Sequence, residues 1–137
     1  MAVKEFELLT KIRSYVYDID SVVFKMKKSS RPVLGDDIRH ESYYLVKEVN
    51  LANSSCATSD MPRDLVIATL KNRIVHIDHV LASLKTLGFL LDMASDKKII
   101  HDNANARLMH QAVPISRMAI SWSKQTKEKL VSMTCGG

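Results

Sequence analysis

The fold is decided by the stretch Ile67–Leu91, which reads IATLKNRIVHIDHVLASLKTLGFLL. Its apolar residues recur at alternating spacings of three and four, which places them on one face of a helix. The pattern lasts for more than three heptads and is typical of a helix packed in a bundle. We predict a helix over residues 61–94, with Asp60 as its N-cap. Its seam comprises Ile67, Leu70, Ile74, Ile77, Leu81, Leu84, Gly88 and Leu91.

Three further helices are predicted around this stretch, over residues 4–28, 34–53 and 96–131. Pro32 separates the first two, a polar loop follows the second, and Ser95 is the expected N-cap of the last. Pro114 predicts a bend or a break near His110–Val113.

The chain has 137 residues with only four glycines and three prolines, which favours long helices over a β-sandwich or barrel. The fold class expected is all-α, and residues 1–137 form a single domain. Its architecture is an antiparallel up-down-up-down four-helix bundle.

The predicted third helix is apolar nearly all round near residues 87–90, and this pattern points to self-association. Gly88 lies on its seam, where glycine costs roughly 1 kcal/mol relative to alanine. We therefore interpret Gly88 as a site of close approach by a neighbouring helix or ring. Leu87, Leu90 and, on the last helix, Trp122 are the other packing or interface candidates.

The net charge of +5 comes entirely from residues 97–137, because the basic and acidic residues balance before Lys97. A basic helix on a neutral body favours a polyanionic partner, nucleic acid before membrane, and a solvated helix face is the alternative. Aromatic residues are only 6% of the chain, so binding would be by salt-sensitive phosphate contact. The candidate contact residues are Arg107, Arg117, Lys124, Lys127 and Lys129, with Lys71 and Arg73 from the preceding helix.

The five histidines of the chain are potential metal ligands or catalytic groups. His76, Asp78 and His79 form an HxDH string, but the seam places both histidines on flanking faces, so no metal site is predicted. Arg73 and His79 form an R-x5-H string that resembles the motif of helical ribonucleases of the HEPN type. Because no polar residues cluster around that string, a ribonuclease is only the third hypothesis.

Other function classes leave no sequence signal. There is no Gly-rich phosphate loop, HExxH helix or serine elbow, so we expect no enzyme and no cofactor. Cys56 and Cys135 are expected to be free thiols. No signal peptide and no long uninterrupted apolar run is present, so we expect a cytoplasmic protein without a membrane partner.

Three strings of the sequence resemble parts of one known family. They are residues 84–92 with 95–98, residues 115–124 with Arg117, Met118 and Trp122, and Leu34-Gly35-x-x-Ile38. The family is the accessory variability determinants (Avd) of diversity-generating retroelements, relatives of four-helix proteins encoded within bacterial ribosomal RNA genes. The first string resembles the junction between the family's third and fourth helices, the second resembles its fourth-helix signature, and the third resembles the start of its second helix.

The resemblance implies a non-enzymatic protein that assembles as a homopentameric barrel. It implies binding to a reverse transcriptase and to its template RNA, or to DNA, in support of mutagenic reverse transcription. The ribosomal-gene relative, an interaction protein of undefined partner, is the second hypothesis.

Overall fold

The computed structural model describes the backbone of residues 2–135 and the side chains of residues 7–134. It contains four α-helices and no strand within that range, which confirms the all-α, four-helix prediction. The helices are α1 (Ala2–Phe24), α2 (Asp36–Ser54), α3 (Arg63–Asp96) and α4 (Asp102–Cys135). A short π-helical turn, η1 (Arg31–Gly35), leads into α2.

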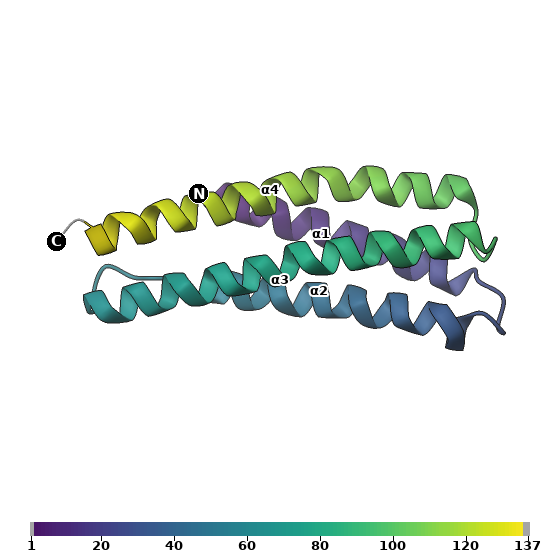
Figure 1. Ribbon diagram of the computed structural model, residues 1–137, viewed down its shortest axis with the longest axis horizontal. Helices are drawn as coiled ribbons and strands as arrows, with labels where there is room; N and C mark the ends of the chain where they lie inside the picture. Colours follow the sequence, from purple (N-terminus) through teal and green to yellow (C-terminus); the bar gives the residue numbers. More distant parts are fainter. Residues whose placement is uncertain (1, 136–137) are drawn as a thin grey trace.

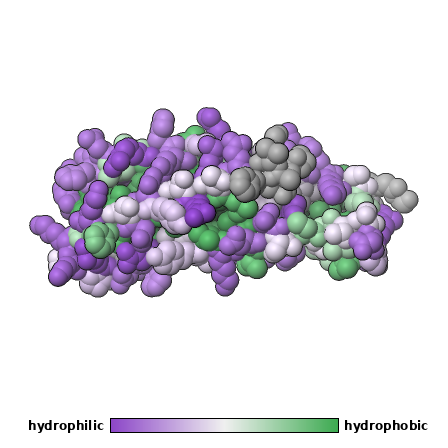
Figure 2. Space-filling model, turned by 180° about the vertical axis from the view of Figure 1, so that it is seen from behind, coloured by the Kyte–Doolittle hydropathy of each residue, from purple (hydrophilic) through white to green (hydrophobic). Residues whose placement is uncertain are grey.

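Figure 1 shows the helices lying along the long axis of an elongated molecule, with the chain reversing direction between successive helices. Helix α3 packs against both α2 and α4, and α1 packs against the same two helices. Hydrogen bonds fix the pairing of α3 with α4: Asn105 bonds Asp92 at one end and Arg63 bonds the carbonyl of Met133 at the other. On the face opposite to that of Figure 1, hydrophilic side chains predominate and apolar ones form separate patches (Figure 2).

The core of the bundle is built from the inward faces of all four helices. Its buried α3 residues differ from the predicted seam at every second position. Leu70, Ile77, Leu84 and Leu91 are buried as expected, whereas Ile67, Ile74, Leu81 and Gly88 are only half-buried. The residues buried in their place are Val66, Val80, Leu87 and Ala94, whereas Arg73 is half-buried.

Three predicted helix ends were wrong by several residues, one of them the end of α4, which lies at Cys135 and not at residue 131. Helix α1 ends at Phe24, not residue 28, and Arg31 donates a hydrogen bond to the Phe24 carbonyl beyond that end. Helix α4 begins at Asp102, not residue 96, because the chain turns at Lys98 with a φ of 60°. Ser95 therefore lies inside α3, and its hydroxyl donates to the Asp102 carboxylate at 2.5 Å.

The close-approach interpretation of Gly88 is wrong, because a Cβ placed there meets nothing within 4 Å. The glycine under real steric pressure is Gly35, where a Cβ would lie 3.1 Å from Val23 Cγ1 and 3.2 Å from Met26 Sδ. Leu87 is fully buried within its own chain and is unavailable to a partner. Leu90 is partly buried and packs on the core.

Pro114 does not break α4, which is continuous from Asp102 to Cys135. Figure 1 shows the helix bowing along its length instead. Proline removes one helical hydrogen bond, and a gentle curve accommodates that loss more cheaply than a break.

Helix α3 is the one described helix that is long and apolar enough to cross a membrane by length and composition. Its most apolar window has a mean hydropathy of 1.4, although the prediction from sequence was that no long apolar run is present. A core helix of a soluble protein passes the same test, and 33% of the α3 window is buried inside the bundle.

Candidate functional site

Helix α4 carries a stripe of three exposed cations, Arg117, Lys124 and Lys127, which we call the basic stripe. Among the described residues, none of the three pairs with a carboxylate. Exposed apolar side chains alternate with them at helical spacing. These are Val113, Ile120 and Val131, which are 43%, 56% and 57% exposed.

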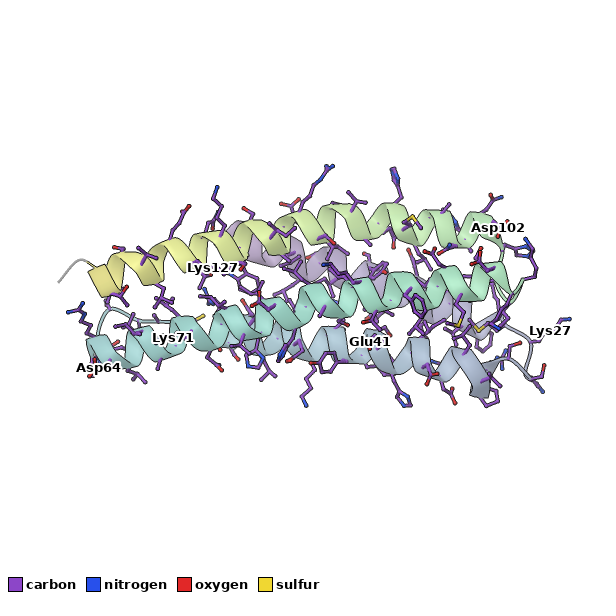
Figure 3. The ribbon with its side chains drawn as sticks, in the orientation of Figure 1. Lys27, Glu41, Asp64, Lys71, Asp102 and Lys127 are labelled. Atoms are coloured by element: carbon purple, nitrogen blue, oxygen red, sulfur yellow. The ribbon has the colours of Figure 1, made fainter. Side chains whose placement is uncertain are left out.

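A groove of about 560 Å³ lies between α3 and α4 beside the basic stripe. Lys124 and Lys127 line it together with the apolar side chains of Leu81, Ile120 and Val131. Asp78 and Glu128 also line the groove and reduce its positive charge. Figure 3 shows Lys71 of α3 and Lys127 of α4 toward the same end of the bundle, so α3 adds a cation on this side.

Arg107 was predicted to act with the other basic residues of the last helix, but it is separated from the basic stripe. It lines a hollow of about 670 Å³ at the other side of α4, beside Lys25 of α1 and Lys98 of the α3–α4 turn. Lys129 is exposed on α4 but lines neither hollow. The predicted basic residues of α4 are thus spread around the helix.

Arg73 is held inside the bundle and does not form part of an open basic surface. Its Nε donates to the Ala52 carbonyl at 3.2 Å, and its Nη2 lies 3.1 Å from Cys56 Sγ. Its guanidinium lies 5.3 Å from the centre of the Trp122 ring, in a cation–π contact. Arg73 therefore joins α2, α3 and α4, and the buried Trp122 is a packing residue within the chain.

Helices α2 and α3 bring Glu48, His76 and His79 together, a grouping that was not predicted from the sequence. The Glu48 side chain is only 6% exposed, and its Oε2 lies 3.0 Å from His76 Nδ1. Its Oε1 lies 2.5 Å from His79 Nδ1 and accepts a hydrogen bond from the Tyr44 hydroxyl at 3.2 Å. We call Glu48, His76 and His79 the Glu–His cluster.

Opposing effects act on the ionisation of Glu48. Burial disfavours the charged carboxylate, but hydrogen bonds from His79, His76 and Tyr44 outweigh it and lower the pKa of Glu48 below its ordinary value. The carboxylate is therefore ionised at neutral pH.

A signal for Glu48 was present in the sequence. Leu45, Val49 and Ala52 are apolar and recur at helical spacing in the second helix, and Glu48 lies among these residues on the same side of the helix. A charged residue there needs partners, but their identity depends on how α2 is aligned with α3, and the sequence does not specify that alignment.

The predicted ribonuclease pair is not assembled into one site. Arg73 contacts Ala52, Cys56 and Trp122, whereas His79 contacts Glu48. Cys56 is a free, exposed thiol, as expected, and the side chain of Cys135 lies outside the described residues.

Known proteins provide no further assignment: no family model, curated protein or solved structure gives a significant match.

Proposed function

We propose that the protein is a non-enzymatic, nucleic-acid-binding accessory subunit of a reverse transcriptase in a diversity-generating retroelement. The observation that carries the proposal is the basic stripe, three exposed cations on one helix without a described carboxylate partner. Unpaired cations at a surface release counterions from a polyanion on binding, which is the main source of non-specific affinity for nucleic acid.

The spacing of the basic stripe suits a nucleic-acid strand. Arg117 and Lys127 are ten residues apart, or about 15 Å along a helix. A duplex rises about 3.4 Å per base pair along its axis, so that length spans roughly four base pairs. The stripe would therefore contact phosphates of the backbone, without reading base sequence.

Self-assembly as a homopentamer with the up-down-up-down topology is the second element of this proposal. Phe89 of α3 lies in the segment that the sequence links to self-association and is 64% exposed, which suits burial against another copy. A ring of copies would repeat the basic stripe, and multivalent contact raises avidity without new contacts within one subunit.

The assignment to a retroelement is supported by the resemblance around Arg117. In this string Arg117 is exposed, whereas Met118 is half-buried and Trp122 packs in the core. In such a string the basic residue is exposed to a partner while the apolar residues hold the helix in the bundle, and this arrangement suits contact with another molecule.

The genes around the reading frame distinguish the two related hypotheses. A reverse transcriptase gene beside the reading frame would favour this function, and a surrounding ribosomal RNA gene would favour the ribosomal-gene relative. Both predict a cytoplasmic protein.

Fluorescence anisotropy with a labelled single-stranded RNA tests the proposal directly. We expect the variant Arg117→Glu/Lys124→Glu/Lys127→Glu to lose binding and the control Lys47→Glu, an exposed cation on α2, to retain it. Each lost phosphate contact should reduce the salt slope by about 0.7. Unchanged RNA binding of the triple variant at low salt would refute the role of the stripe.

Solution mass tests the assembly. Light scattering should give about five times the 15.5 kDa chain mass at moderate salt, and a monomer would exclude the pentamer.

Co-purification with the neighbouring reverse transcriptase tests the partner. If the intact protein did not co-purify with that enzyme, the accessory function would be contradicted. Cleavage of RNA that is lost in His79→Ala would instead favour the ribonuclease hypothesis.

A further inference from the structure

The Glu–His cluster presents three metal-ligating groups toward one point between α2 and α3. His76 and His79 are three residues apart, so they occupy neighbouring positions on the same face of α3. Their donor atoms and those of Glu48 all lie within 4.8 Å of one another. Only the backbones of two packed helices, and no flexible loop, position these side chains.

The donor set suits a first-row transition metal better than Ca²⁺ or Mg²⁺. Imidazole nitrogen is a preferred ligand of Zn²⁺, whereas the harder cations require oxygen ligands. A tetrahedral zinc with ligand bonds of about 2.0–2.1 Å holds its ligands about 3.3 Å apart. The present nitrogen–oxygen distances of 3.0 and 2.5 Å would lengthen by less than one ångström, which side-chain rotation supplies.

The cluster is closed on one side and open on the other. The Glu48 and His76 side chains are 6% and 18% exposed, whereas that of His79 is 45% exposed. A metal ion would enter beside His79 and displace the hydrogen bonds that now join the imidazoles to the carboxylate. Three protein ligands leave a fourth position for water, and the Tyr44 hydroxyl beside Glu48 is positioned to bond that carboxylate from outside.

We propose that Glu48, His76 and His79 form a binding site for a divalent transition metal, with Zn²⁺ as the expected ion. The metal site does not depend on the proposed nucleic-acid function, because the basic stripe lies on the α4 side of the bundle and the cluster lies between α2 and α3. Bound metal would stabilise the α2–α3 contact, since a ligand that binds only the folded chain raises the free energy of unfolding.

Calorimetric titration of the chelator-treated, full-length protein with zinc chloride tests the site. A Cys56→Ser/Cys135→Ser background removes both thiols as competing ligands. We expect one Zn²⁺ per chain with micromolar or tighter affinity, and an increase in melting temperature on binding. His79→Ala should weaken binding on the order of tenfold or more, and it should leave the helical fold intact because His79 is partly exposed.

Two exposed histidines provide matched controls. His101→Ala and His110→Ala each remove an imidazole away from the cluster and should leave zinc affinity unchanged. The visible absorption of bound Co²⁺ should report nitrogen and oxygen ligation in the parent protein and disappear in His79→Ala. Absence of stoichiometric zinc binding, or equal affinity in the parent and His79→Ala, would overturn the site and leave the cluster as a hydrogen-bonded network alone.

Discussion

The two sides of α3 differ in chemistry although they belong to one helix. Toward α2 the contacts are polar: Ser83 donates to Glu41 at 2.7 Å, His76 and His79 bond Glu48, and Asn72 donates to Ser55 at 2.8 Å. Toward α4 the side-chain hydrogen bonds that link the two helices lie near their ends, at Asp92–Asn105 and Arg63–Met133. The region between them contains apolar packing, an open groove and the cation–π contact of Arg73 with Trp122.

The difference indicates what each contact contributes. Apolar packing supplies most of the free energy of folding. It does not strongly select one alignment of two helices, because apolar side chains of similar size can replace one another in a contact. Hydrogen bonds between buried polar groups add less net free energy but are costly to break, so they select one alignment of the helices. We therefore expect the α3–α4 side to govern stability and the α2–α3 side to govern alignment and ligand chemistry.

The largest effect is expected from truncating an apolar core residue. Ile115→Ala on α4 should lower the free energy of unfolding by about 3–4 kcal/mol, because Ile115 is only 1% exposed and leaves a cavity. Ile120→Ala, five residues later and 56% exposed, should change it by less than about 0.5 kcal/mol. Urea denaturation of both variants measures the contrast, and equal losses would contradict the assigned orientation of α4.

A smaller loss is expected on the polar side. Glu48→Ala should cost about 2–3 kcal/mol, because it leaves His76 without its buried carboxylate partner. The control Glu128→Ala removes an exposed carboxylate and should be nearly neutral. A stable Glu48→Ala variant in thermal unfolding would mean that the cluster contributes little to the α2–α3 contact.

The two glycines sharpen the comparison further, with effects of opposite sign. Gly88→Ala should stabilise α3 by about 0.5–1 kcal/mol, since alanine favours the helix and its Cβ meets open space. Gly35→Ala should destabilise, because its Cβ would press on Val23 and Met26. If calorimetric melting ranks these two variants in the reverse order, the packing around η1 is misassigned.

The last effect is confined to acidic solution. Glu48 has a folded pKa below its ordinary value of 4.5, so its contribution to stability is complete above that value and is lost as the pH falls through the folded pKa. Glu48→Gln removes this titration, so its unfolding free energy should fall less steeply than that of the parent below about pH 5. Parallel acid profiles would show that Glu48 is not the group responsible.

The number and approximate extent of the helices could be predicted from sequence, because apolar residues at heptad spacing over long stretches form a continuous face only on a helix. The buried side of α3 could not be assigned fully, since Ile67, Ile74 and Leu81 are as apolar as the residues that fill the core. Periodicity alone does not distinguish two adjacent apolar flanks of one helix.

Of the two candidate sites, residues of the basic stripe were predicted from the sequence and the Glu–His cluster was not, for a related reason. The basic stripe is local to α4, so Arg117, Lys124 and Lys127 could be named from the sequence, but together with Arg107 and Lys129, which lie on other parts of the helix surface. The Glu–His cluster joins residues 28 and 31 positions apart, and it exists only in one alignment of α2 with α3. Local sequence carries no information on such an alignment, which packing and buried hydrogen bonds determine together.

Arg73 has a consequence for misfolding. A heptad repeat is self-similar, so a helix displaced by seven residues presents almost the same apolar surface to its neighbours. Arg73 interrupts that repeat between Leu70 and Ile77, and in the observed pairing its guanidinium reaches the Ala52 carbonyl and the Trp122 ring. A pairing slipped by seven residues would move this half-buried charge away from both partners, so a single arginine disfavours the slipped pairings relative to the correct one.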